Sequence, residues 1–128
     1  MIRNRLVQFQ GGDTQIAADS TAVALTGIVM PSPGKIKSIT GWIGTKTGSN
    51  AAQLDVFKSG AAGSSAAAST TSCLSAAMDM TSDAIITGTL STTLSAINFI
   101  AGEVLYLKVT TGATTSIDDY SVTVVVDY

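Results

Sequence analysis

The side chains that most often carry enzyme chemistry are sparse in this sequence, and one type is missing. The 128 residues include no histidine. Histidine is the commonest general base, the commonest metal ligand and the usual pH-sensitive side chain, so each of these roles loses its first candidate. A Ser–His–Asp or Cys–His catalytic site cannot be assembled from this chain. We therefore expect no enzyme activity and no small-molecule substrate.

Carboxylates are the next candidates, because paired carboxylates hydrolyse glycosides and clustered ones bind Ca²⁺. Asp79 and Asp83 form one group, and Asp118 and Asp119 form another. Neither group has the spaced Asp, Asn and Gly pattern of a calcium-binding loop. Glu103 is the only glutamate and stands at the start of an expected strand. We expect these acids to form turns or to be solvated, with no metal and no cofactor.

Two isolated motifs have simple structural explanations. The segment Gly41–Gly48 (GWIGTKTG) faintly resembles a phosphate-binding loop. Such a loop needs glycine directly before its lysine, but Thr45 precedes Lys46 here, so we expect a strand that ends in a turn. Cys73 is the single cysteine. It cannot form a disulfide within the chain, and we expect it to be a buried apolar side chain.

Small and hydroxylated residues dominate the composition. Ala, Gly, Ser and Thr supply 62 of the 128 residues, and charged residues make up only 12%. That charged fraction is about half the usual share in a soluble domain. The net charge is −2, and no cluster of positive charge indicates nucleic-acid binding. Short apolar runs predict no membrane span, and the first ten residues lack the apolar stretch of a signal peptide.

Alternation of apolar and polar residues predicts an all-β fold. The clearest strand ends the sequence, with Tyr120, Val122, Val124 and Val126 on one face. The other clear strands are expected at 22–30, 35–44, 51–58 and 103–110. Three further segments, 72–78, 85–90 and 94–100, are expected to form short or weak strands. Seven to eight short strands at regular spacing favour an antiparallel β-sandwich that is jelly-roll-like.

One of these strands changes face part-way along. Ile36 has the opposite parity to Ile39 and Ile43, so a β-bulge near Lys37–Ser38 is needed to keep all three side chains in the core. The bulge turns Trp42 to the other face. We expect Trp42 to be partly exposed or to lie against a partner.

The sequence also divides into an N-terminal segment and a body. Residues 1–21 are expected to form an extended arm or an edge strand, and residues 22–128 the β-sandwich domain. Residues 59–71 have almost nothing to bury and predict a long flexible loop. Residues 72–81 leave a short helix open as an alternative to a strand. We expect the domain to remain folded without residues 1–10.

The order of certain segments resembles a known group of proteins. The segments are Pro33–Ile39 (PGKIKSI), Ala51–Gly60 (AAQLDVFKSG), Phe99–Val109 (FIAGEVLYLKV) and the final valine-rich strand. Together they resemble the small β-sandwich proteins of tailed-phage virions, especially capsid decoration (cement) proteins with a jelly-roll body. The resemblance covers about 22–128 and consists of strand and turn patterns. Similar strings occur in appended domains of tail and fibre proteins.

The resemblance implies a homotrimer on the outer surface of an icosahedral capsid, bridging neighbouring major capsid proteins, and synthesis in the host cytoplasm. The arm and the exposed tryptophan supply the candidate contacts with the capsid or a neighbour, namely Arg3, Arg5, Leu6, Val7, Phe9 and Trp42. A second hypothesis is a virion-attached module that binds glycans or another receptor, with Trp42 and exposed tyrosines stacking on sugars. An enzyme is the third and least favoured.

Overall fold

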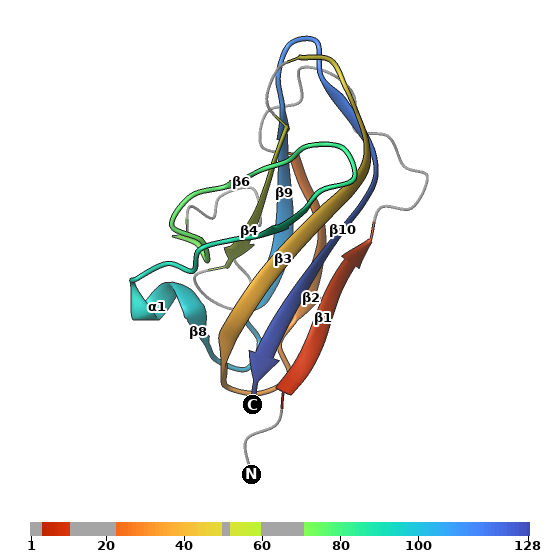
Figure 1. Cartoon of the computed structure of the whole chain (residues 1–128). Coiled ribbons are helices and arrows are strands. Elements are labelled where there is room, and N and C mark those ends of the chain that lie inside the picture. The colour runs from red at the N-terminus through yellow and green to blue at the C-terminus, as the bar shows by residue number, and fades with distance from the viewer. Residues whose placement is uncertain (1–3, 11–22, 50–51, 60–70) are drawn as a thin grey trace.

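The computed structural model describes residues 4–10, 23–49, 52–59 and 71–128, which form two antiparallel sheets (Figure 1). Sheet A contains, in spatial order, β1 (Asn4–Gln10), β10 (Ser116–Asp127), β3 (Gly34–Thr47) and β7 (Ile85–Thr87), with β8 (Asn98–Phe99) also on β3. Sheet B contains β2 (Val23–Val29), β9 (Val104–Thr111), β4 (Ala52–Lys58) and β5 (Thr71–Ser72), with β6 (Met78–Asp79) also on β4. The expected all-β sandwich is confirmed.

The strand order is that of a jelly roll. The chain alternates between the sheets, because β1 and β3 lie in sheet A whereas β2 and β4 lie in sheet B. The last two strands then insert into the middle of the sheets: β9 between β2 and β4, and β10 between β1 and β3. The last two strands of the chain therefore lie in the middle of the two sheets. This position explains why the valine-rich C-terminal strand is so apolar.

The described residues contain ten strands at eight strand positions. Two positions are each divided into short pieces: β5 and β6 both pair with β4, whereas β7 and β8 both pair with β3. The sequence prediction of seven to eight strands matches the number of positions. These divided strands coincide with the segments in which the alternation of apolar and polar residues is weakest.

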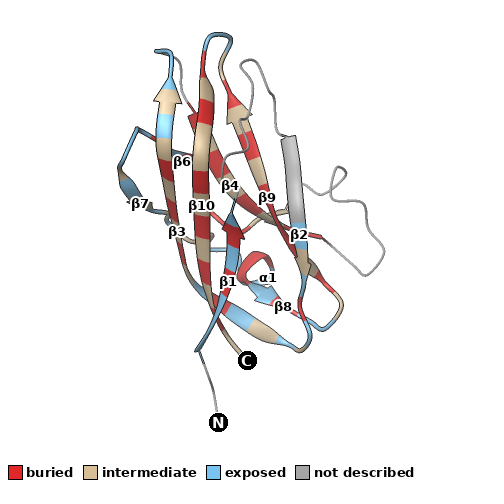
Figure 2. Cartoon of the chain, turned by 90° about the vertical axis from the view of Figure 1, so that its right-hand side faces the viewer, coloured by how far each residue is buried: buried red, intermediate tan, exposed pale blue. Residues whose placement is uncertain are grey.

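The core lies between the sheets and follows the predicted alternation. Along β10 the side chains of Tyr120, Val122, Val124 and Val126 are all buried, which Figure 2 shows as alternating bands of burial. The core cluster joins them to side chains of sheet B, among them Leu54, Val56, Leu105, Leu107 and Val109. Burial of this apolar surface is the main term that stabilises the sandwich.

The predicted bulge is confirmed at Lys37. In the pairing of β3 with β10, Ser38 lies opposite Val125 but Ile36 lies opposite Val126, so Lys37 is the extra residue. The shift brings Ile36 and Ile39 to the same face, and both are fully buried. One extra residue thus resolves the conflict of parity in the sequence.

The expected strand at 94–100 is wrong in its first half. Residues Leu94–Ile97 form a helical turn, α1, and only Asn98–Phe99 pair with β3. The helical turn buries the consecutive residues Ala96 and Ile97, which a strand cannot do on a single face. The helix left open for 72–81 does not form either, since Leu74 makes a β-bridge to Leu90 and Met78 lies in β6.

Residues 4–10 form an edge strand, which is one of the two alternatives for the N-terminal segment. All seven residues of β1 pair with β10, and Val7 and Phe9 belong to the core cluster. That the domain stays folded without residues 1–10 stays a prediction, but the deletion removes two core side chains and one strand of sheet A and should lower the stability. Residues 1–3 and 11–22, and with them the proposed boundary at 21, lie outside the described residues.

The predicted flexible loop 59–71 also lies largely outside the described residues, which omit 60–70. Its first residue is well ordered by hydrogen bonds. The Ser59 N–H donates to the Val104 carbonyl at 2.9 Å, and the Val104 N–H donates to the Ser59 hydroxyl oxygen at 2.9 Å. These bonds extend the pairing of β4 and β9 by one residue.

Candidate functional site

The middle of the outer face of sheet A is an uncharged surface built from rows of residues that pair across the strands. The row that contains the only tryptophan consists of Gln10, Ser121, Trp42 and Ile85. The next row consists of Gln8, Thr123, Thr40 and Thr87. Because neighbouring strands lie about 4.8 Å apart, each row is roughly 14 Å long. The face therefore offers amides and hydroxyls together with a few apolar side chains.

A shallow groove lies at the tryptophan end of this face. Its volume is about 320 Å³, and residues of β1, β3 and β10 line it: Gln10, Trp42, Asp119, Tyr120 and Ser121. Small-molecule sites in proteins occupy about 300–1,000 Å³, so the groove is at the small end of that range. Its lining combines an indole with amide, hydroxyl and carboxylate groups.

Gly44 and Asp119 shape the groove. A Cβ atom on Gly44 would lie 3.2 Å from Cη2 of Trp42 and 3.0 Å from Cβ of Asp119, so the absence of a side chain lets both residues close over the strand. Asp119 adopts a left-handed conformation with φ of 52°, which aspartate tolerates better than most residues. Its N–H donates to Oδ1 of Asp118 at 3.1 Å. This bond ties the Asp118 carboxylate to the backbone of Asp119.

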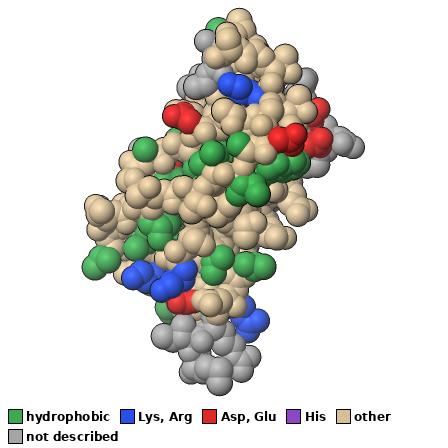
Figure 3. Space-filling model, viewed as in Figure 1, with side chains coloured by type: hydrophobic (Ala, Val, Ile, Leu, Met, Phe, Trp, Pro, Cys, Tyr) green, Lys and Arg blue, Asp and Glu red, His purple; other side chains and the backbone are tan. Residues whose placement is uncertain are grey.

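The opposite end of sheet A, which we call the base, carries most of the exposed positive charge of the described residues. A hollow of about 400 Å³ is lined by Pro33, Gly34, Lys35, Lys37, Asp127 and Tyr128. Lys37 is half exposed, and its Nζ atom lies 3.7 Å from Oδ2 of Asp127. Arg5 lies at the same end because it pairs with Val126. Figure 3 shows Lys and Arg side chains gathered here beside an acidic side chain, and further Asp or Glu side chains together with a basic one toward the other end.

The six candidate contact residues differ in their exposure to solvent. Arg5 and Leu6 are exposed, Leu6 by 65%, whereas Val7 and Phe9 are buried at 7% and 4%. Val7 and Phe9 thus point into the core of their own domain and cannot also contact a partner while β1 is paired. Trp42 is half-buried on the outer face, as the sequence predicts. Arg3 lies outside the described residues.

The residues weighed for metal or catalytic chemistry have structural roles. Asp79 accepts a hydrogen bond from the Gln53 side-chain amide at 2.8 Å, and Asp83 occupies a left-handed turn position. In the part of the chain that the structure describes, no three acidic, cysteine or histidine side chains are close enough to hold a metal. One Ser-x-x-Lys spacing, from Ser32 to Lys35, lies in the bend that leads into β3.

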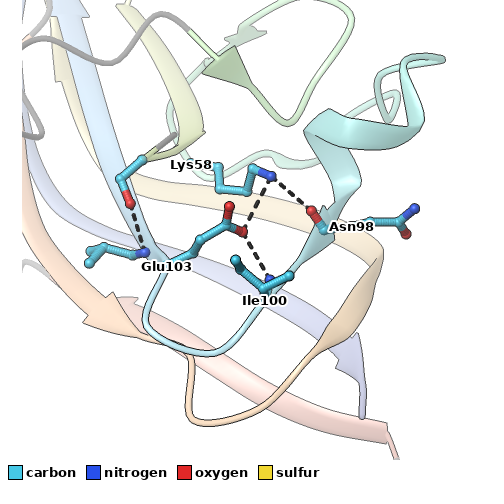
Figure 4. A network of polar contacts seen from close by, with 6 residues as sticks. Lys58, Asn98, Ile100 and Glu103 are labelled. Atoms are coloured by element: carbon cyan, nitrogen blue, oxygen red, sulfur yellow. Dashed lines mark hydrogen bonds and ion pairs between the residues drawn. The ribbon is translucent and has the colours of Figure 1, made fainter. Parts of the chain in front are cut away.

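A buried ion pair closes the sandwich near α1 (Figure 4). The Lys58 side chain points inward, and its Nζ atom lies 3.3 Å from Oε2 of Glu103 and donates to the Asn98 carbonyl at 2.9 Å. The same carboxylate accepts from the Ile100 N–H at 3.0 Å. These contacts satisfy two charges inside the protein and join β4, β8 and the start of β9. The network stabilises the fold and is not a binding site.

The outer face of sheet B carries a compact aromatic and ionic group. The rings of Phe57 and Tyr106 stack with centroids 6.0 Å apart, and Nζ of Lys108 lies 4.4 Å from the Phe57 centroid. Beside them, burial raises the pKa of Asp55, although the Ser72 hydroxyl donates to its carboxylate at 2.6 Å and Lys108 lies nearby. The Tyr106 ring is fully buried even though it lies on an outer face.

Cys73 is buried, as the sequence predicts. Its side chain has no exposed surface, and burial raises the pKa of its thiol to about 12. The nearby carboxylate of Asp55 acts in the same direction, because negative charge disfavours a thiolate. The thiol is therefore kept neutral and unreactive at physiological pH.

Among the described residues, no helix is long and apolar enough to cross a membrane.

Comparisons with known proteins give little beyond this geometry. No protein-family model matches the sequence, and no curated protein matches it either. One solved structure to which the chain is similar is that of infectious bursal disease virus Gx strain, with a TM-score of 0.46 and 14% sequence identity. The similarity covers 96% of this chain but only 32% of that one. A likeness this distant carries no argument about function.

Most of the residues that form the groove and the base could not be brought together from the sequence alone. The groove exists because Gln10, Ser121 and Trp42 lie side by side in the sheet, although they come from the beginning, the end and the middle of the sequence. Only the register of the strands reveals this. The two lysines of the base were visible as Lys35 and Lys37 in the segment KIK, but their proximity to Arg5 depends on the same pairing.

Proposed function

We propose that the protein is a non-enzymatic structural component of a virion, which binds the outside of an icosahedral phage capsid and stabilises it by bridging major capsid subunits. The observation that carries the proposal is the base, where the exposed Lys35 and Lys37 line an open hollow and the exposed Arg5 lies at the same end of the sheet. In this proposal the protein is made in the host cytoplasm and resides on the outer capsid surface. The partner is the major capsid protein.

The distribution of charge gives the proposed attachment a direction. Arg5, Lys35 and Lys37 are exposed at the base. Asp127 lies among them at the end of β10, which runs between β1 and β3. The far end carries the carboxylates of Asp118 and Asp119 on β10 and one lysine, Lys46, on β3. This positively charged end of the sheet, the base, is complementary to an acidic patch on a capsid surface, because opposite charges orient two proteins as they meet. Tyr128 and Leu6 add apolar surface beside the charges.

The edges of the sandwich suit contacts with neighbouring copies. β1 and β2 are the outermost strands of their sheets and lie along the same side of the sandwich (Figure 2). β1 contains one charged residue, Arg5, and no proline, so it has few of the features that keep an edge strand from pairing with another chain. We propose that these edges join the subunits of a homotrimer through main-chain hydrogen bonds.

Attachment of this kind stabilises a shell without any catalytic group. A protein that binds the assembled shell but not its separated parts adds about 2.7 kcal/mol per site at a hundredfold excess over the dissociation constant. A trimer engages three sites together, and this raises the overall affinity above that of one contact. The scarcity of charge elsewhere on the outer face of sheet A allows close packing against a protein surface.

The test is cosedimentation with expanded shells of the major capsid protein encoded in the same genome, together with the mass in solution by light scattering. We expect the protein to pellet with the shells, to raise their melting temperature and to have a trimeric mass. A monomer that stays in the supernatant at every shell concentration would refute the proposal.

A further inference from the structure

The groove beside Trp42 has the composition of a sugar-binding site, and we propose that it binds a neutral glycan. This inference does not depend on capsid attachment, because the groove and the base lie at opposite ends of sheet A. One side of the site is the half-buried indole of Trp42, and the other consists of the Gln10 amide, the Ser121 hydroxyl and the Asp119 carboxylate.

Sugar rings have two kinds of surface, and the groove has a match for each. The axial C–H groups of a pyranose form an apolar face that packs on an aromatic ring, and an indole offers the largest such ring. The equatorial hydroxyls form a polar rim that needs both donors and acceptors. Gln10 supplies both, Asp119 supplies acceptors, and Ser121 supplies a hydroxyl.

The position of the polar groups relative to the indole follows from the strands. Gln10 pairs with Ser121, and Ser121 pairs with Trp42, so the three side chains stand in one row on three adjacent strands. Asp119 lies two residues before Ser121 on β10 and lines the same groove. Gly44 lets the indole and the carboxylate approach each other, as its Cβ distances show. The site is thus built on sheet strands and needs no loop to close.

The charge of the lining selects the class of glycan. No lysine or arginine lines the groove, whereas Asp119 does, and Asp118 is its neighbour in the chain. A sialylated or sulfated sugar would bring a second negative charge close to these carboxylates. The adjoining row of Gln8, Thr123, Thr40 and Thr87 is also uncharged. Both observations favour a neutral oligosaccharide that extends from the groove along this row.

The size of the groove suits a small ligand. A volume of about 320 Å³ is enough for a small ring system and lies at the lower end of the range of small-molecule sites. Its openness to solvent is typical of sites that bind sugars weakly and reach useful affinity through several copies, which a trimer would supply.

The experiment begins with an array of neutral and sialylated oligosaccharides, probed with the full chain and with single-residue variants. We expect binding to neutral glycans, which Trp42→Ala lowers by about tenfold or more because truncation removes the stacking surface. The matched control is Ile85→Ala, which removes an apolar side chain that is 73% exposed and pairs with Trp42 but does not line the groove. This control should bind as the unaltered protein does.

Two conservative variants keep the test decisive if Trp42→Ala does not fold. Trp42→Phe retains a smaller ring and should retain weaker binding. Asp119→Asn keeps the shape and tolerates the left-handed backbone, and the loss of a charged acceptor should lower affinity by about threefold or more. Because Trp42 is the only tryptophan, its fluorescence should change saturably when the strongest neutral oligosaccharide of the array is added.

Several results would overturn the assignment. These are a silent array, binding that is confined to sialylated glycans, and neutral binding that neither Trp42→Phe nor Asp119→Asn weakens. An equal loss in Ile85→Ala and Trp42→Ala would show general apolar adsorption and would also overturn it. None of these results bears on capsid cosedimentation, so the two proposals fail separately.

Discussion

The ammonium group of Lys58 lies 3.3 Å from the carboxylate of Glu103 inside the sandwich, and the side chains are only 10% and 6% exposed. Their positions follow from strand parity. Lys58 has the same parity as the buried Ala52, Leu54 and Val56 of β4, so β4 directs a charged residue toward the interior. Glu103 and the Asn98 carbonyl provide the contacts that make this burial tolerable.

Breaking this pair should destabilise the domain strongly. Lys58→Met leaves the Glu103 carboxylate buried without its cation, which costs about 3–5 kcal/mol. In Lys58→Met/Glu103→Gln the amide oxygen can still accept from Ile100, and most of the loss should be recovered. Urea unfolding measures both variants. A single variant that loses less than about 1 kcal/mol would show that the pair is solvated and not buried.

β1 should behave as part of the folded domain and not as a detachable arm. Phe9→Ala truncates a side chain that is 4% exposed and should cost about 3 kcal/mol. Its matched control is Gln8→Ala, the exposed neighbour on the same strand, which should change stability by less than about 0.5 kcal/mol. Equal stabilities for Phe9→Ala and the unaltered protein in urea unfolding would show that β1 is not packed in solution.

The half-buried carboxyl of Asp55 should make stability depend on pH. Burial raises its pKa above the ordinary value of 3.8, so the folded state binds its proton more tightly than the unfolded state does. The free energy of unfolding contributed by Asp55 is therefore highest at low pH, and it falls as the pH rises from the unfolded pKa through the folded one.

Asp55→Asn should remove this contribution. The variant should gain stability relative to the unaltered protein at about pH 7 and lose that advantage at about pH 3, where the carboxyl is protonated in both states. Urea unfolding at both pH values measures the difference between the two proteins, which cancels the other titrating groups. A difference that is the same at both pH values would contradict the raised pKa.

Cys73 should be protected from thiol reagents in the native protein. A thiol with a pKa of about 12 forms very little thiolate at neutral pH, and the side chain is also inaccessible. Intact-mass spectrometry after treatment with iodoacetamide should show an unmodified native chain and complete modification in denaturant. Rapid labelling without denaturant would show that the end of β5 opens locally.

Much of the fold could be predicted from the sequence, because alternation marks a strand that is buried on one face. β10 and the bulge at Lys37 follow from the parity of particular valines and isoleucines. α1 could not be predicted in this way, since Ala96 and Ile97 sit among serine and threonine residues that permit either structure. The inward direction of Lys58 was readable from its parity with Val56 but was missed.

The candidate sites were much harder to predict than the strands. The sequence marks Trp42 as an outward-facing residue, yet Gln10, Asp119 and Ser121 carry no local signal of a shared groove. Their juxtaposition depends on β1 pairing with β10 and on β10 pairing with β3, contacts between opposite ends of the chain. The arm-like sequence of residues 1–10 predicts Val7 and Phe9 as contacts with a partner, whereas strand pairing turns both side chains into the core.

The central claim is attachment to a capsid through the base, and a charge-reversal experiment tests it most directly. The variant Lys35→Glu/Lys37→Glu changes two exposed lysines of the base, whereas Lys46→Glu near the end of β3 is the control for a reversed charge elsewhere. The measurement is cosedimentation with expanded shells at low and at physiological salt, after both variants are shown to melt like the unaltered protein. Surface ion pairs such as Lys37–Asp127 contribute little to folding, so folding should persist.

The predicted result is that the unaltered protein and Lys46→Glu pellet with the shells, that added salt weakens this binding, and that the base variant remains in the supernatant. If the base variant pellets as fully as the unaltered protein at both salt concentrations, the base is not the attachment surface and the account is contradicted.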